Sequence, residues 1–158
     1  AANSVVVFCM PSVVIAYAML FTALRDHRVP HYLGEDTYAA MKWLEANAKK
    51  HDTVLSSIET GQLIPRIAGI KVYLGHYMIT KDSAGKQGNV KRFYGTQGDD
   101  VFKQKLIAGN GIRYVLFSPS EQRANGMNPT EHPWLVPRFK QGLAELFEVV
   151  PNAASPTK

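Results

Sequence analysis

The chain has a single cysteine, Cys9, and it has no charged residue between Ala1 and Leu24. One cysteine excludes a disulfide within the chain, and a body without thiols fits an extracytoplasmic location. The uncharged segment is almost wholly apolar, which favours a lipid environment over the core of a protein. As a helix it would reach roughly 36 Å, enough to cross a hydrocarbon layer of about 30 Å. We therefore predict a transmembrane helix over residues 1–24.

The chain also lacks the residue patterns of common binding and catalytic sites. Lys and Arg number 18 against 13 Asp and Glu, giving a net charge of +5. The basic residues are scattered singly or in short pairs, so we expect no nucleic-acid partner. His27 and His31 are one helical turn apart, but Pro30 between them breaks that helix, and no other histidines have metal-ligand spacing. Since serine-hydrolase, Walker and dinucleotide motifs are absent as well, we expect no metal, no cofactor and no catalytic residue.

Beyond residue 25, helical and strand-like patterns alternate along the chain. Pro30 and Gly34 exclude a continuous helix over 25–35, which we interpret as a membrane-exit linker. Asp36 is expected to cap the helix that follows, and Asp99 to cap a later one. The pattern predicts helices over 37–50, 61–69 and 89–108 (broken near 95–98), strands over 53–58, 70–74, 112–117 and 146–150, and a polar loop over 118–138.

This alternation predicts the fold class, which is one N-terminal transmembrane helix followed by a small, mainly parallel α/β sandwich domain. The domain is expected over 36–150, and residues 151–158 are expected to form a frayed tail. The segment after the span is long enough for one compact domain and too short for two. Because the chain begins without Met, we expect it to be a processed or truncated piece.

Polar residues gather where the predicted strands end. In parallel α/β sheets, ligands bind outside the carboxyl ends of the strands, and such groups would suit a sugar or a phosphate-bearing head group. A purely structural role is the alternative, in which Thr60 caps a helix, Gly75 makes a turn and His76 hydrogen-bonds to the backbone. The candidate ligand-binding residues are Glu59, Thr60, Gly61, Gly75, His76, Thr80 and Lys81.

The segment 52–94 carries a family resemblance. It contains a strand ending in a glycine turn, an I-P-x-x-A-G helix over 64–69, a V-Y-x-G-H strand end over 72–76 and a V-x-x-F-Y helix end over 90–94. With D-T-Y-x-A-x-x-W-L at 36–44 and IRYVLFSPSE at 112–121, it resembles the extracytoplasmic C-terminal domain of bacterial GT-C-type membrane glycosyltransferases. Those proteins are similar to the polyprenyl-phosphate-mannose-dependent mannosyltransferases.

The resemblance implies a location and a function. It implies a membrane-anchored, non-catalytic domain on the periplasmic side, because the family's catalytic carboxylate lies in an early loop that this chain does not contain. The domain would assist acceptor or lipid-head-group binding. Its partners would be the lipid bilayer, other transmembrane helices or subunits, and a polyprenyl-phosphate sugar. Arg25 and Arg28 alone would favour a cytoplasmic body, but a few charges beside one helix do not fix a multi-spanning topology.

A second hypothesis comes from a different class of protein. The chain could be a single-pass accessory or structural subunit of a larger membrane complex, held there by helix packing. In both hypotheses the chain alone transfers no sugar.

Overall fold

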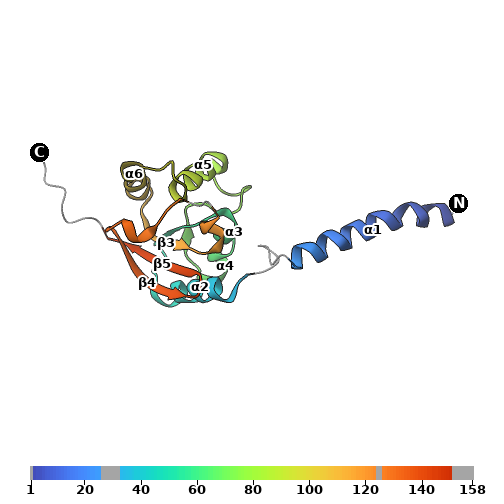
Figure 1. Cartoon of the computed structure of the whole chain (residues 1–158), viewed down its shortest axis with the longest axis horizontal. Helices are drawn as coiled ribbons and strands as arrows, with labels where there is room; N and C mark the ends of the chain where they lie inside the picture. Colours follow the sequence, from blue (N-terminus) through green and yellow to red (C-terminus); the bar gives the residue numbers. More distant parts are fainter. Residues whose placement is uncertain (1, 26–32, 124–125, 151–158) are drawn as a thin grey trace, which may run out of the picture. The chain divides into compact units, whose positions relative to one another are not determined.

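The computed structural model describes residues 2–25, 33–123 and 126–150, and the chain divides into two units, Ala1–Gly34 and Glu35–Lys158 (Figure 1). Helix α1 (Ala2–Arg25) makes up most of the described part of the first unit, so the helix predicted over 1–24 is confirmed. In the described part of the chain, no helix has both the length and the apolarity needed to cross a bilayer. The transmembrane part of that prediction is therefore unsupported. Most of the predicted exit linker and the whole predicted tail 151–158 lie outside the described residues.

The second unit is built on one five-stranded sheet of order β2-β1-β3-β5-β4. The first three strands are parallel, whereas β5 is antiparallel to both β3 and β4. The prediction of a mainly parallel sheet is therefore corrected to a mixed sheet, because the last two strands form an appended hairpin. The strands are β1 (Thr53–Leu55), β2 (Lys71–Val72), β3 (Ile112–Phe117), β4 (Leu135–Gln141) and β5 (Ala144–Val149).

The terminal hairpin explains both errors in the predicted sheet. The fourth predicted strand exists as β5, but β4 begins inside the stretch that we expected to be a loop. Pro137 argues against a strand in the sequence, so β4 was not predicted. In the structure, the pairing of β4 with β5 changes register between Pro137 and Phe139. The hairpin turn uses Gly142 at φ 51°, where a Cβ would also lie 2.1 Å from a carboxylate oxygen of Asp36. A residue with a side chain would therefore be disfavoured at this turn.

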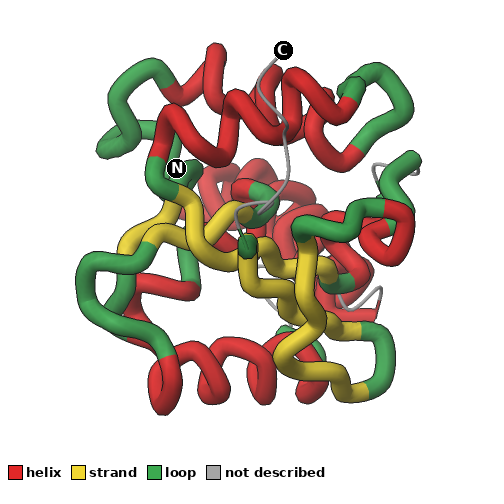
Figure 2. The backbone as a smooth tube through the Cα atoms, turned by 90° about the vertical axis from the view of Figure 1, so that its left-hand side faces the viewer, coloured by secondary structure: helices red, strands yellow, loops and turns green. Residues whose placement is uncertain are grey.

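Helices cover both faces of the sheet (Figures 1 and 2). On one face, α2 (Glu35–Asn47) packs against β4, β5 and α4 (Ile64–Ala68). On the other face lie α5 (Ser83–Tyr94) and α6 (Asp100–Asn110), with α6 contacting β3. The short segments α3 (Ile58–Gly61), α7 (Pro119–Gln122) and the 3-10 turn η1 (Pro129–Glu131) complete the described fold.

The helix ends test the capping predictions. Asp99 does cap α6, since its carboxylate accepts the backbone N–H of Phe102 at 2.8 Å. The predicted break near 95–98 is also confirmed, because α5 ends at Tyr94 and α6 starts at Asp100. Asp36 is not the cap of α2, which already begins at Glu35. Its carboxylate instead accepts the backbone N–H of Leu143 at 3.1 Å, and it thereby ties α2 to the β4–β5 turn.

Alternation along the strands divides the apolar core between the two faces. Trp43 of α2 packs edge to face on Tyr114 of β3, with 6.1 Å between the ring centroids. Val54 of β1 is the register partner of Tyr114. Their neighbours along the strands point to the opposite face, because successive strand residues alternate. There Leu55 and Val115 belong to the larger core cluster, together with Phe93, Tyr94, Leu106, Ile107, Trp134 and Phe147.

Candidate functional site

A pocket of about 410 Å³ opens at the carboxyl ends of the parallel strands. From β1 the chain continues to β2 on one side, whereas the neighbour on the other side is β3. A topological switch of this kind lies between β1 and β3, and it is where open α/β sheets bind ligands. The pocket is lined by Ser57, Ile58, Glu59, Leu74, Gln87, Val90, Lys91, Tyr94, Ser120, Glu121 and Arg123.

Glu121, which is only 1% exposed, joins the two turns that border this pocket. Its Oε1 accepts the backbone N–H of Ser57 at 2.8 Å, from the turn after β1. Its Oε2 accepts the backbone N–H of Ser118 at 3.0 Å, as part of the capping box of α7. One carboxylate therefore fixes the ends of two neighbouring strands with respect to each other.

Two hydroxyl groups complete the environment of the same carboxylate. Thr60 donates to Oε1 at 2.6 Å, and Ser118 donates to Oε2 through its side chain at 2.5 Å. All four donors are uncharged, so the negative charge is balanced by dipoles. A carboxylate offers about four acceptor positions, and these contacts occupy that number. Glu121 is therefore committed to structure rather than free to act as a base.

The phenol of Tyr94 forms the inner wall of the pocket and is completely buried. Its hydroxyl donates to the backbone carbonyls of Leu116 at 2.7 Å and of Leu55 at 3.0 Å. Burial, together with the nearby charge of Glu121, raises the pKa of Tyr94 well above its usual value. The phenol is therefore a neutral donor that links β1 to β3 beneath the pocket.

The outer part of the pocket carries the groups that could meet a ligand. Lys91 of α5 and Arg123, just after α7, are exposed cations on its lining. Gln87, Glu59 and Ser120 add neutral and acidic hydrogen-bonding groups. Cationic groups beside hydroxyl-binding groups suit a ligand that has a phosphate and a sugar.

Three of the predicted binding residues lie at or just behind this pocket. Glu59 lines the pocket, and Thr60 lies behind the lining, where its hydroxyl donates to Glu121. The N-cap of α3 is Ser57 rather than Thr60, and Gly61 ends that helix instead of starting one. A Cβ on Gly61 would lie 2.0 Å from the carbonyl oxygen of Leu74, so the glycine allows the segment after β2 to approach α3. Ligand binding by these three residues stays a prediction.

The other four predicted residues build the loop after β2. The backbone N–H of Gly75 donates to the hydroxyl of Thr80 at 3.2 Å. His76 is exposed, stacks on Tyr77 at 4.8 Å and accepts the backbone N–H of Met78 at 3.3 Å through Nδ1. Lys81 is exposed beyond them. The loop leaves the same edge of the sheet, but its residues do not line the pocket, and their ligand role also stays a prediction.

Sequence reasoning missed most of the pocket lining. Gln87, Lys91 and Tyr94 come from α5, and which face of that helix meets the strand ends is a tertiary property. Glu121 did have a local signal, since Ser118-Pro-Ser-Glu121 is a capping-box sequence directly after a strand. That pattern predicts a hydrogen-bonded helix start directly after β3.

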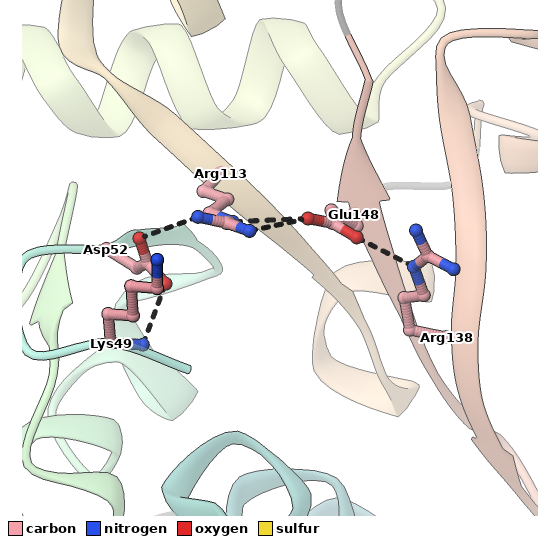
Figure 3. Close-up of polar contacts among 5 residues, drawn as sticks. All are labelled: Lys49, Asp52, Arg113, Arg138 and Glu148. Carbon is pink, nitrogen blue, oxygen red and sulfur yellow. Dashed lines mark hydrogen bonds and ion pairs between the residues drawn. The ribbon is translucent and has the colours of Figure 1, made fainter. Parts of the chain in front are cut away.

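A larger pocket of about 710 Å³ lies at the opposite end of the strands. Figure 3 shows the row of charges beside it, in which Arg113 of β3 contacts Glu148 of β5 at 3.0 Å and Asp52 at 3.5 Å. Arg138 of β4 contacts the other oxygen of Glu148 at 2.7 Å. Burial alone would raise the pKa of Glu148, but the hydrogen bonds from both arginines outweigh it and lower the pKa. Because both arginines are paired, the row connects three strands and the turn before β1 and is not an open anion site.

A third polar cluster lies under α6. The Lys103 ammonium is 3.1 Å from Nε2 of His132, and Nδ1 of His132 is 2.8 Å from Asp100. Burial lowers the pKa of both Lys103 and His132. The described residues contain no group of three or more His, Cys, Asp or Glu side chains arranged to hold a metal ion.

Comparison with known proteins finds similarity in structure but none in sequence. No protein-family model matches the sequence, and no curated protein does either. The structure is similar to a crystal structure of the C-terminal globular domain of an oligosaccharyltransferase from Archaeoglobus fulgidus, with a TM-score of 0.55 and 15% identity. The match covers 75% of this chain and 99% of that one, so the two domains share a fold.

Proposed function

We propose that the chain supplies a non-catalytic globular domain to a GT-C-type membrane glycosyltransferase. The observation that supports this best is the fold shared with the oligosaccharyltransferase domain, which is matched over 99% of its length. The pocket chemistry agrees, because Glu121 is saturated by donors and Tyr94 is held neutral. The bacterial polyprenyl-phosphate-mannose-dependent type is the finer form of the proposal, and it rests on the sequence motifs alone.

The role proposed for the pocket is to hold a phosphate-bearing sugar head group. Lys91 and Arg123 would meet the phosphate, and Gln87 and Ser120 would meet sugar hydroxyls. A short-chain isoprenyl phosphate mannose is a suitable probe for titration calorimetry. Replacing either cation by glutamine should weaken binding by about tenfold, the effect of one charge-assisted hydrogen bond at a solvated site.

The matched control is Lys105→Gln, which removes an exposed lysine of α6 outside the pocket lining. Its affinity should equal that of the unaltered chain. Equal affinities for Lys91→Gln, Arg123→Gln and the control would rule out a head-group pocket here. Sugar transfer by the isolated chain would contradict the non-catalytic role.

The proposed location is the membrane, with the α/β domain on the periplasmic side. The sequence resemblance and the kind of domain matched by the fold support this placement. A fusion of alkaline phosphatase after the last described residue, Val150, should be active in cells, because that enzyme folds only outside the cytoplasm. Fluorescence from a green-fluorescent-protein fusion at the same position, without phosphatase activity, would place the domain inside.

A second candidate is an accessory subunit of a larger membrane complex. Helix α1, considered by itself, exposes its apolar side chains over the stretch 12–22, including Tyr17, Met19 and Phe21. In this candidate, these side chains would pack against transmembrane helices of the partner subunits. Native purification should then recover the chain with stoichiometric partners, and migration of the chain alone would exclude this candidate.

A further inference from the structure

The loop between β2 and α5 is a closed turn rather than a slack connection. The carbonyl of His76 accepts the backbone N–H groups of both Ile79 and Thr80, at 3.0 and 2.9 Å. The Gly75 N–H bond to the Thr80 hydroxyl closes the base of the turn, and Asp82 then caps α5. These bonds give the loop a defined shape without any apolar core of its own.

This turn projects three consecutive apolar side chains outward. Tyr77 is 60% exposed, Met78 is 76% exposed and Ile79 is 87% exposed. Single exposed apolar residues are common on protein surfaces, but a run of three at the tip of a bonded turn is not. Because the backbone is fixed by its own hydrogen bonds, the outward direction of these side chains is built into the structure.

The segment that contains the turn has charges of one predominant sign. Over residues 71–91 the sequence has four lysines and one acidic residue, Asp82, so the formal charge of this segment is +3. The Asp82 carboxylate is engaged by the backbone N–H of Gly85. Lys81 stands beside the tip, and Lys86 lies over the ring of Tyr73 at 4.9 Å. An apolar tip with a basic surround is complementary to an anionic lipid surface.

A protein partner fits this feature less well. A stable protein interface covers about 800 Å² on each partner, and its core is a broad patch depleted in charge. Three side chains on a narrow turn, with lysines close behind, cannot provide that area. Exposed apolar side chains that include a tyrosine do suit the interfacial layer of a bilayer, where tyrosine is favoured.

We infer that the 77–79 tip (Tyr77, Met78 and Ile79) inserts into the interface of an anionic bilayer. The pocket at the carboxyl edge of the sheet shares Leu74 and α5 with the base of this loop, so the inserted tip would bring the pocket to the membrane surface. The inference goes beyond the proposed function, because it concerns the contact with lipid and needs no ligand in the pocket.

Depth labelling of the full chain tests this directly. In a Cys9→Ser background, Met78→Cys would carry an environment-sensitive nitrobenzoxadiazole label, and vesicles of phosphatidylglycerol and phosphatidylethanolamine would be added. The label should shift its emission to the blue, become several-fold less quenched by aqueous iodide and become quenched by doxyl-labelled lipids. Val101→Cys on α6 and Leu143→Cys on the hairpin turn are matched controls, being 76% and 62% exposed, and they should show none of these changes.

The depth of the label at position 78 distinguishes insertion of the tip from membrane binding through α1. Equal iodide quenching at position 78 and at the two controls would overturn the inference. A blue shift that appears without vesicles and grows with protein concentration would also overturn it, because it would indicate contact with a second copy of the chain. In the labelled chain, Lys81→Gln with Lys86→Gln should reduce the shift on anionic vesicles. Arg123→Gln alters the head-group pocket but lies outside the 71–91 segment, so insertion that survives in this variant would separate the two proposals.

Discussion

The backbone N–H of Ser57 donates to the carboxylate of Glu121 at 2.8 Å across 64 positions of sequence. The bond joins the turn after β1 to the turn after β3, and the two strands are also joined by the parallel ladder between them. A buried side chain that fixes two strand ends determines the shape of the pocket above it. Removing this carboxylate should therefore lower the stability of the whole domain.

Glu121→Ala should lower the free energy of unfolding by about 2–4 kcal/mol, because it leaves the buried N–H and O–H donors of Ser57, Thr60 and Ser118 without an acceptor. Urea unfolding followed by circular dichroism measures this loss. Glu45→Gln on the exposed surface of α2 is the control and should change stability by about 0.5 kcal/mol or less. Equal effects of the two substitutions would contradict the role given to Glu121.

Tyr94→Phe should cost about 1–2 kcal/mol, since the carbonyls of Leu55 and Leu116 lose their shared donor while the packing of the ring is kept. In an ultraviolet titration of the unaltered chain, Tyr94 should be the last of the seven tyrosines to ionise, because burial raises its pKa well above the usual value. The variant should lose that late step. Loss of an early step instead would show that Tyr94 is accessible to solvent.

His132 should make the domain less stable in mild acid. Burial, helped by the positive charge of Lys103, lowers its pKa below the usual 6.5, so in acid the unfolded chain binds a proton before the folded one does. The stabilising contribution is present above about pH 6.5 and is lost as the pH falls through the folded pKa. Thermal melting from pH 7.5 down to pH 5 should show a steeper decline for the unaltered chain than for His132→Gln, which keeps a polar group without this titration.

Two glycines in helices should respond to alanine in opposite directions. Gly61→Ala would place a methyl group against the Leu74 carbonyl and should destabilise the domain by about 2 kcal/mol or more. Gly88→Ala lies within α5 with nothing near the added methyl, so it should stabilise by about 0.5–1 kcal/mol. Melting temperatures compare the two directly. A Gly61→Ala protein of unchanged stability would mean that α3 and the segment after β2 can separate without cost.

Predictions from the sequence succeeded where an element depends on neighbouring residues and failed where it depends on distant ones. The apolar run at 112–117 predicted β3 correctly, and Asp99 marked the start of α6, because both depend on neighbouring residues. β4 failed because Pro137 argues against a strand locally, while its pairing with β5 is set by the turn at Gly142. Asp36 looks like a helix cap in sequence, but its partner Leu143 is supplied by a distant hairpin.

The candidate site divides in the same way. Alternation of helices and strands predicted that polar residues would meet at the strand ends, and Glu59 does line the pocket there. The cations Lys91 and Arg123 could not be found, because their place depends on how α5 and α7 pack over the sheet. Sequence patterns do not distinguish the apolar tip formed by residues 77–79, since exposure is a property of the folded chain.

The arrangement of the sheet also bears on how the domain behaves at high concentration. The strand order leaves β2 and β4 at the two edges, where unpaired backbone groups could recruit strands from other molecules. β2 is only two residues long, and β4 carries a register shift together with Pro137, Arg138 and Lys140. A short edge on one side and an irregular, charged edge on the other both discourage strand addition. Copies of the domain can therefore crowd together without their sheets joining into aggregates.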